Sequence, residues 1–571
     1  MTQENSKMQD KSTYSRAAFW ILSAALVLFV LILCGVPRPE NDLFWQLRTG
    51  REIIAHHSVP YADSYSWTAK GHPWVVHEWL AFVLFWTVYS LGHAFTGLFV
   101  IKAIVAAATV FILFRHLCWA TQYTLIPALF LTGLAAMSVS IGFEMRPQIF
   151  TYFFLALVCS LVLRMREENY KDKKIWLLVP IFIAWANVHS GVIVGLFLLG
   201  AWCVGDFIDG VNSPDPQEGK VRNGRAKSLL PVLIVCLLGT LLTPYGIAEY
   251  SDFAETLGNS NVINAVSEWG SPSLHDSAGM NFCFLAGVLL AGVLFSKRFV
   301  LLGDIIILIA LLHSSLTSYR NIPLFALVAS MIAVPYLAEL VRVKKAEISA
   351  SKVENTSIFG ANPEIPAAII AAFGIVFIAF ASTSHSYKQA AANGQAGSSK
   401  IASITGGSIS TISEPVSAVN FIQTHAFDPS WRMYNGYDEG GYLIWMLPQY
   451  PVSIDGRADV YFGKVFDDYL SLNRQSYDWK SKLAQYPSDF ILVSASSGLA
   501  KDIMNSPEWA LVYASDSDLD SKLPVAGAEN AVIFVRRDAK NTSDIQRLRL
   551  SCPAISTAGF AAKYGDYPAV H

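Results

Sequence analysis

The chain has 571 residues, of which 53% are hydrophobic and 15% are charged, and its formal net charge is −2. Such a composition is too apolar for an ordinary soluble protein and is typical of a multi-pass membrane protein with a soluble part attached. The near-neutral charge argues against a nucleic-acid partner, and the seven cysteines form no spacing that predicts a disulfide framework or a metal site.

A polar stretch at residues 1–16 precedes the first long apolar run, at 17–36. This run has about twenty residues, enough for a helix that crosses a membrane, and no small-residue cleavage site follows it. We therefore expect a cytoplasmic N-terminus and a first span that is retained rather than cleaved as a signal peptide.

Further apolar runs of spanning length follow as far as residue 382, and one shorter run covers 79–91. The spanning runs lie near 17–36, 94–114, 123–142, 149–163, 175–188, 191–208, 229–246, 281–296, 299–316, 322–341 and 366–382. If the short run lies flat at the outer interface, the basic clusters between the spans face the cytoplasm, as the positive-inside rule requires. These clusters are Arg115/His116, 164–174, 220–227, 296–298 and 341–345. The charge pattern therefore predicts a transmembrane domain of about eleven spans at 17–382, with a first outer loop at 37–93.

The chain changes character after residue 383. Residues 383–412 are rich in Gly, Ser and Ala, which predicts a flexible linker. Residues 413–571 alternate helix-like and strand-like segments, which predicts a small α/β domain outside the cytoplasm. Within this domain, Asp455, Arg457 and Asp459 follow a short apolar strand. They favour a structural turn with an Asp–Arg ion pair, and an acceptor-binding or active-site-capping surface is the alternative.

The first outer loop combines an acid with histidines and tryptophans. Residues 42–56 place Leu43, Leu47, Ile53 and Ile54 on one helical face, which predicts an amphipathic helix at the outer surface. Asp42 at its start is also a favoured helix cap, but it follows the first span so closely that it lies where a lipid headgroup would be. The remaining polar and aromatic candidates of this loop are Trp45, Trp74, His77, Glu78 and Trp79.

Four other outer loops add charged, amide and aromatic groups. They offer Glu144 with Arg146, Asn187 with His189, Glu268 with Trp269, and Tyr319 with Arg320 and Asn321. Each group alone is typical of a residue at the end of a span. Together, cationic groups that face one carboxylate suit an anionic lipid substrate.

These segments resemble the GT-C superfamily of membrane glycosyltransferases. The matching text is "ENDLFWQLRTG", then "HEWLAFVLFWTVYSLG", "RPQIFTYFF" and "WANVHSGVIVG", and the layout matches over roughly residues 17–340. Members of this superfamily have an acidic residue soon after the first span, interfacial helices and often a soluble C-terminal domain. Many carry an adjacent acid pair, whereas here Asn41 separates Glu40 from Asp42, which leaves open which of the two is catalytic.

The resemblance implies a glycosyltransferase of the cytoplasmic (inner) membrane that moves a sugar from a polyprenyl-phosphate donor to an acceptor outside the cytoplasm. The acceptor would be a glycan, a lipid or a protein. Asp42 would be the general base and Glu78 would orient an imidazole or hold a divalent cation, Mg or Mn; no motif requires a cofactor. The donor phosphate would contact Arg146, Arg320, His77 and His189, and sugar rings would contact Trp45, Trp74, Trp79 and Tyr319.

Two other functions fit the same layout. A transporter or flippase for a lipid-linked sugar or small molecule usually holds ionisable groups near the membrane midplane, whereas these spans are nearly free of charge apart from Lys102. A non-enzymatic membrane scaffold with a partner-binding tail would not need Asp42. The gathering of polar residues at one membrane face favours the enzyme.

Overall fold

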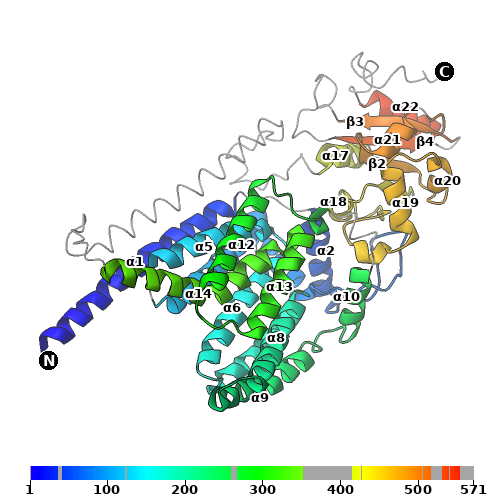
Figure 1. Ribbon diagram of the computed structural model, residues 1–571. Coiled ribbons are helices and arrows are strands. Elements are labelled where there is room, and N and C mark those ends of the chain that lie inside the picture. Colours follow the sequence, from blue (N-terminus) through cyan, green and yellow to red (C-terminus); the bar gives the residue numbers. More distant parts are fainter. Residues whose placement is uncertain are drawn as a thin grey trace. The chain divides into compact units, whose positions relative to one another are not determined.

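A computed structural model describes most of the chain (Figure 1). The described residues are 2–35, 41–122, 125–258, 267–350, 414–425, 427–504, 506–515, 530–538 and 541–552. The predicted linker at 383–412, the predicted span at 366–382 and the acid Glu40 lie outside these residues.

The chain separates into two compact units, each built from segments distant in sequence. Unit 1 comprises Met1–Gly35, Phe99–Ile247 and Val266–Ser384, and unit 2 comprises Val36–Leu98, Ala248–Ala265 and His385–His571. The predicted first outer loop thus belongs to the same unit as the predicted C-terminal domain.

Unit 1 is built from long apolar helices. They are α1 (Thr2–Leu33), most of α4 (Ala94–Ala120), α5 (Leu125–Val139), α6 (Gln148–Glu167), α7 (Leu178–Ala186), α8 (Val192–Val211), α9 (Pro216–Gly239), α12 (Ser277–Phe295), α13 (Leu302–Thr317) and α14 (Ile322–Ala350). Short helical turns η2 (Ser140–Gly142), η3 (Lys173–Leu177), η4 (Ser267–Trp269) and η5 (Tyr319–Asn321) connect them. Helix α14 packs against α5, α6, α12 and α13, so the core of unit 1 forms around it.

Within the described residues, six helical segments are long and apolar enough to cross a membrane. They are Ala94–Ala120, Leu125–Gly142, Gln148–Glu167, Val192–Val211, Ser277–Phe295 and Tyr319–Leu340, and shorter apolar helices cover Ala17–Leu33, Trp79–Gly92 and Leu302–Thr317. The prediction of a multi-pass helical membrane protein is confirmed. The predicted number of about eleven spans is not confirmed.

Unit 2 contains a four-stranded sheet in the order β1-β2-β4-β3. The strands are β1 (Met433–Asn435), β2 (Phe490–Ser494), β3 (Trp509–Ala514) and β4 (Ala531–Arg536); β1 and β2 are parallel and the other pairs are antiparallel. Almost every strand residue is buried, as is typical of a sheet that is covered on both faces. The predicted α/β region at the C-terminal end of the chain is confirmed.

The helices of unit 2 come from all three of its segments. They are α2 (Asn41–His56), α3 (Trp79–Val88), η1 (Tyr89–His93), α10 (Ala248–Gly258), α17 (Val416–Thr424), α18 (Gly440–Met446), η6 (Ala458–Tyr461), α19 (Lys464–Asn473), α20 (Trp479–Leu483), α21 (Gly498–Ile503) and α22 (Thr542–Leu550). Helix α2 matches the amphipathic helix predicted at 42–56. Leu43, Leu47 and Ile53 are buried, as the predicted apolar face requires. Ile54 was expected on the same face but is 39% exposed, because it lies beyond Ile53, the last buried residue of the helix.

Backbone hydrogen bonds join the first outer loop to the α/β region. Trp67 N donates to Val452 O over 3.0 Å, and Val452 N donates to Tyr65 O over 3.0 Å. The Trp67 indole also donates to Met433 O at the start of β1, over 2.8 Å. Unit 2 is therefore a single packed body in which the loop after the first apolar helix is part of the α/β region.

Candidate functional site

Asp42 lies in the first turn of α2, at the positive end of the helix dipole. Its Oδ1 accepts a hydrogen bond from the Trp45 indole over 3.2 Å. The backbone of Gly456 lies directly against the same oxygen, because a Cβ at that position would approach Asp42 Oδ1 to well under 3.0 Å. The carboxylate is thus held between its own helix and a loop of the α/β region.

Tyr437 holds the loop residue that contacts Asp42. Its hydroxyl donates to the Gly456 carbonyl over 2.9 Å. Burial, and after it the negative charge of Asp42, raises the pKa of Tyr437 well above its ordinary value. The hydroxyl therefore stays protonated and keeps the Gly456 carbonyl in place.

Two further acids lie beside Asp42, in the turn that precedes α18. Loss of surrounding water, together with Asp42, raises the pKa of Asp438. Burial and the neighbouring Asp438 raise the pKa of Glu439 from 4.5 to about 7. We call Asp42, Asp438 and Glu439 the acid cluster; at neutral pH it can hold and release a proton.

A cavity of about 290 Å³ opens next to the acid cluster. Its lining is largely polar and includes Asp438, Glu439, Tyr434, Tyr469, Ser494 and Ser497. Hydroxyl and carboxylate groups of this kind can form hydrogen bonds with a hydroxyl-rich ligand.

His77 belongs to a second group of acids in the same unit. Its Nε2 lies 2.7 Å from Asp252 Oδ2, and Nδ1 is buried with no hydrogen-bond partner among the described residues. Burial favours the neutral ring, but Asp252, Asp459 and Glu78 outweigh it and raise the pKa of His77 above 6.5. Burial and Asp252 likewise raise the pKa of Asp459 to about 6. We call His77, Asp252 and Asp459 the His77 cluster.

A buried arginine anchors the loop that carries Gly456 and Asp459. Arg457 Nε and Nη2 donate to the two oxygens of Asp455 over 2.8 and 2.6 Å, and Nη2 lies 2.8 Å from Asp63 Oδ1. The predicted ion pair between Asp455 and Arg457 is confirmed. The guanidinium also lies over the Trp74 ring, 4.5 Å from its centroid, so this cluster is a structural core rather than a surface.

The three tryptophans expected to contact sugar differ in burial. Trp45 and Trp74 pack edge to face against one another with ring centroids 6.1 Å apart, and only 8% and 4% of their surfaces are exposed. This burial favours a packing role for both rings. Trp79, the first residue of α3, is half-buried and keeps part of its ring accessible.

In unit 1, the loop before α6 and the turn η5 before α14 both contact the turn η4, which precedes α12. Arg146 Nη1 donates to both oxygens of Glu268, over 2.9 and 3.0 Å. Arg320 lies over the ring of Trp269, 5.9 Å from its centroid. Loops far apart in the sequence thus form one cluster of charged and aromatic groups, to which Tyr319 is tied by a 2.9 Å hydrogen bond from its backbone to Gly270 O.

His189 lies in the turn before α8 with a fixed ring orientation. Its Nδ1 accepts a hydrogen bond from Gly191 N over 2.8 Å and lies 3.0 Å from Thr151 Oγ1. Thr151 Oγ1 itself accepts from the Trp185 indole, so its proton points to the imidazole. Since Nδ1 is the acceptor, the proton of the neutral ring resides on Nε2, which is then a donor.

Neither a protein-family model nor a curated protein sequence matches the chain. Among solved structures, the apo oligosaccharyltransferase of Archaeoglobus fulgidus is similar over 86% of this chain and 70% of its own, with a TM-score of 0.51 and 11% identity. The chain therefore shares the fold of this oligosaccharyltransferase. The resemblance predicted from the sequence is confirmed at the level of the fold.

Two other solved structures align with this chain at lower scores. The Archaeoglobus fulgidus oligosaccharyltransferase AglB, in complex with an inhibitory peptide and a dolichol-phosphate, has a TM-score of 0.49 at 11% identity over 96% of this chain and 78% of its own. The arabinofuranosyltransferase AftD from Mycobacteria has a TM-score of 0.44 at 14% identity, over 90% of this chain and 40% of its own.

The predicted site residues of this chain fall into both units. Unit 2 contains Asp42, Trp45, Trp74, His77, Glu78 and Trp79, and unit 1 contains Arg146, His189, Tyr319 and Arg320. Within unit 1, Arg146, Tyr319 and Arg320 are brought into one cluster. Asp42 was predicted to lie close to Arg146 and Arg320. These residues belong to two separate units, so their closeness stays a prediction.

Sequence reasoning missed several acids around Asp42 and His77. Asp438 and Glu439 are flanked by Gly436 and Gly440, and an adjacent acid pair between glycines was a visible signal. Asp459 was noted only as part of the stretch that carries Asp455 and Arg457, and Asp252 gave no signal, because only the fold brings these two acids to His77. Among the described residues, no group of three or more His, Cys, Asp and Glu side chains is arranged to hold a metal ion.

Proposed function

We propose that the protein is an integral-membrane glycosyltransferase that moves a sugar from a polyprenyl-phosphate donor to an acceptor outside the cytoplasm. The observation that carries this proposal is the position of Asp42. It is a carboxylate in the first turn of α2, soon after the first apolar helix, held against Gly456 and close enough to Asp438, which lines a polar cavity, to raise the pKa of that acid. The GT-C fold supports the proposal.

In the proposed reaction, Asp42 takes the proton of an acceptor hydroxyl while the lipid phosphate leaves from the opposite face of the anomeric carbon. A positioned general base of this kind contributes roughly 10²- to 10⁴-fold to the rate. Asp438 lies close to Asp42 and Glu439 follows it in the chain, and the raised pKa of Glu439, about 7, makes it a group that can pass the proton onward. The neighbouring cavity would hold the acceptor, and the accessible part of Trp79 or Tyr319 would contact a sugar ring.

The leaving phosphate needs fixed positive charge or hydrogen-bond donors. Arg146 already shares its charge with Glu268, whereas no carboxylate of the described residues forms an ion pair with Arg320. Arg320 is therefore the stronger candidate, and Nε2 of His189 is the candidate donor. His77 would assist from unit 2, with Asp252 and Glu78 stabilising its protonated form.

The membrane arrangement that we propose follows the charge pattern of the sequence. About eleven spans would leave the N-terminus in the cytoplasm and the α/β region outside it, in the cytoplasmic membrane. A donor with its tail among the membrane lipids would then present its phosphate at the outer interface. The divalent cation expected at Glu78 stays a prediction, and no step of the proposed reaction uses it.

The decisive experiment compares Asp42→Asn with Asp467→Asn in isolated membranes. Asp467 is an exposed acid of α19 in the same unit, so its variant controls for the loss of one negative charge. We expect Asp42→Asn to lower transfer of labelled sugar from the endogenous lipid-linked pool by about 100-fold or more, with Asp467→Asn unchanged. Unaltered transfer by Asp42→Asn, at equal protein levels, contradicts the proposal.

A further inference from the structure

The polar cavity beside the acid cluster lies at the carboxyl ends of two parallel strands of unit 2. Strands β1 and β2 run parallel, and residues that follow each of them line the cavity: Gly436, Asp438 and Glu439 after β1, and Ser496 and Ser497 after β2. Helices α19 and α21 supply further lining. In open α/β sheets, ligands bind in the crevice outside the carboxyl ends of parallel strands. The fold therefore places this cavity where a ligand site is expected.

The charge of the polar cavity disfavours an anionic ligand. Its lining contains the acids Asp438 and Glu439, and no lysine, arginine or histidine of the described residues lines it. Neither acid forms an ion pair within the described part of the chain, and Asp42 adds negative charge close to Asp438. Because like charges repel, a ligand that carries a phosphate or a carboxylate would bind poorly.

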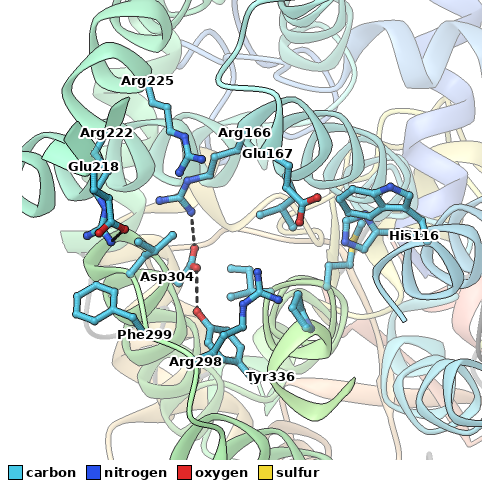
Figure 2. A pocket seen from close by; sticks show the side chains of 16 residues that line it. His116, Arg166, Glu167, Glu218, Arg222, Arg225, Arg298, Phe299, Asp304 and Tyr336 are labelled. Atoms are coloured by element: carbon cyan, nitrogen blue, oxygen red, sulfur yellow. Dashed lines mark hydrogen bonds and ion pairs between the residues drawn. The ribbon is translucent and has the colours of Figure 1, made fainter. Parts of the chain in front are cut away.

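A cavity of about 320 Å³ in unit 1 has no such preference (Figure 2). The arginines and acids that surround it balance one another. The arginines are Arg166, Arg222, Arg225 and Arg298, and the acids are Asp206, Asp304, Glu167 and Glu218. In Figure 2, Asp304 lies between Arg166 and Tyr336, with hydrogen bonds of 2.9 and 3.5 Å to them. By contrast, the polar cavity of unit 2 has charge of one sign only.

Tyr434 provides a buried hydrogen-bond donor for a ligand in the polar cavity. Only 4% of its surface is exposed, it lines the cavity, and its hydroxyl forms no hydrogen bond with the described residues. Burial raises the pKa of Tyr434 above its ordinary value, so the hydroxyl stays protonated. A buried donor without a partner is unfavourable, and a hydroxyl of a ligand would supply the missing acceptor.

Two other lining groups also keep a proton to donate. The Tyr469 hydroxyl accepts from Tyr437 N over 3.2 Å, and Ser497 Oγ accepts from Ala500 N over 3.1 Å. The protons of both hydroxyls have no acceptor among the described residues. Together with the carboxylate oxygens of Asp438, they offer donors and acceptors in one small space. Sugar hydroxyls, which both donate and accept, match this arrangement.

The size of the polar cavity suits a single sugar residue. Its volume of about 290 Å³ is at the lower limit of ligand pockets, which measure roughly 300–1,000 Å³. A serine or threonine side chain of a protein acceptor carries one hydroxyl and would leave most of the lining groups without a partner. A sugar ring carries several hydroxyls and can pair with more of them.

We propose that the polar cavity binds the acceptor as one sugar residue without an acidic group, so that the enzyme extends a carbohydrate rather than a protein. This inference rests on the proposed function, in which Asp42 is the general base. An oxygen of the bound sugar forms the new bond to the anomeric carbon of the donor, the bond from that carbon to the phosphate oxygen breaks, and the hydroxyl proton passes to Asp42.

The first test measures binding by saturation-transfer NMR, with the full-length protein in lipid nanodiscs that contain no sugar-based detergent. The probes are the methyl glycosides of glucose, galactose, mannose and glucosamine, the methyl glycoside of glucuronic acid, and a peptide that contains serine and threonine. We expect at least one of the four non-acidic glycosides to bind, and the glucuronic acid glycoside and the peptide not to bind. Failure of all four to bind, or equal binding of the glucuronic acid glycoside, overturns the proposal.

Tyr434→Phe removes one hydroxyl that bonds no described residue, so the packing of the protein should not change. We expect the glycoside to bind about 3- to 10-fold more weakly, since one hydrogen bond is lost. The matched control is Tyr477→Phe, which removes the hydroxyl of an exposed tyrosine in the same unit that does not line the cavity. Equal binding by the two variants would show that the glycoside binds elsewhere.

A gain of binding tests the charge argument. Ser496→Arg adds a cation at an exposed position of the lining, and Ser481→Arg adds one at an exposed serine of α20 away from the cavity. Only Ser496→Arg should bind the glucuronic acid glycoside. The same gain in both variants, or in neither, contradicts the role of charge in the cavity.

The last test adds the bound glycoside to membranes that carry out transfer. We expect the labelled donor sugar to appear on the glycoside. A glycoside that binds and inhibits without becoming labelled overturns its assignment as acceptor, as does label on the peptide instead. Asp42→Asn that still labels the glycoside contradicts the proposed general base while supporting the cavity as the acceptor site.

Discussion

Gly456 leaves no space for a side chain beside Asp42. A Cβ at residue 456 would overlap Asp42 Oδ1 and also lie 3.6 Å from the Trp45 indole nitrogen. The two residues are more than four hundred positions apart, and the close approach requires the glycine. The position of the candidate base therefore depends on a loop of the C-terminal α/β region.

This relationship predicts a large catalytic effect from a small substitution. In Gly456→Ala, the added methyl group must displace the Asp42 carboxylate or the loop. Because misplacing a catalytic group by about 1 Å can cost roughly 100-fold in rate, we expect sugar transfer to fall by about that factor. The measurement is transfer from lipid-linked sugar in membranes that contain equal amounts of each protein.

The control is Gly258→Ala, at the end of α10 in the same unit. A Cβ at that position has no neighbour within 4 Å, so the methyl group fits without displacement. Equal activity of the two alanine variants would show that the Gly456 contact does not position the base.

The raised pKa of Glu439 predicts how the rate of sugar transfer depends on pH. Burial and Asp438 raise its pKa to about 7, so Glu439 is mostly protonated below pH 7 and ionised above it. Ionised Glu439 makes the acid cluster more negative and favours proton uptake from the acceptor. We expect the transfer rate to rise as the pH increases through about 7, and Glu439→Gln to remove this step.

The control for the pH profile is Glu508→Gln, an exposed glutamate of unit 2. Its profile should match that of the wild type. A step near pH 7 that persists in Glu439→Gln would assign the titration to another group, such as His77.

The sequence predicts the parts of the fold that depend on local patterns. Apolar runs predict the helices of unit 1, and the amphipathic stretch after residue 41 predicts α2 almost to the residue. Alternating strand-like text predicts an α/β region. These features follow from hydrophobic periodicity, which neighbouring residues determine.

The site depends on contacts between distant segments, and these could be predicted only in part. Outer loops were expected to gather, and Arg146 does meet Glu268. The acid cluster was not expected, since Asp42 and Asp438 approach only because α18 packs on α2 through Gly441. The burial of Trp45 and Trp74 was missed for the same reason: exposure is a property of the packed unit, not of the residue type.

The raised pKa of Asp459 predicts that a neutral side chain at this position stabilises the folded protein. Burial and Asp252 raise its pKa from 3.8 to about 6 in the folded protein. The folded state therefore holds this proton more tightly than the unfolded chain. The stabilisation that this provides is complete below pH 3.8 and is lost as the pH rises through about 6.

Asp459→Asn removes a charge that the folded state disfavours at neutral pH. Since one pKa unit corresponds to about 1.4 kcal/mol, we expect the variant to be more stable than the wild type by at most about 3 kcal/mol at pH 8. The advantage should disappear near pH 4. Thermal unfolding of the purified protein at both pH values measures it, with exposed Asp467→Asn as the control; a gain that is equal at the two pH values would contradict the assignment.

A substitution at Gly191 tests whether His189 contacts the donor phosphate. A Cβ at Gly191 would overlap Thr151 Oγ1 and lie 2.9 Å from His189 Nδ1. Gly191→Ala therefore breaks the hydrogen bonds that orient the imidazole and its Nε2 proton. If Nε2 donates to the phosphate, kcat/KM for the lipid-linked donor should fall by about 10-fold, mainly through a higher KM, because a hydrogen bond to a charged group contributes about 1.5–3 kcal/mol.

Gly200→Ala is the matched control, since a Cβ at Gly200 in α8 has no neighbour within 4 Å. Its kinetic constants should equal those of the wild type. A direct comparison with His189→Ala distinguishes orientation from general damage to the protein. If His189 binds the phosphate, Gly191→Ala and His189→Ala should raise KM to a similar extent, at equal amounts of folded protein. A lower kcat with unchanged KM in both would instead assign His189 a role after donor binding.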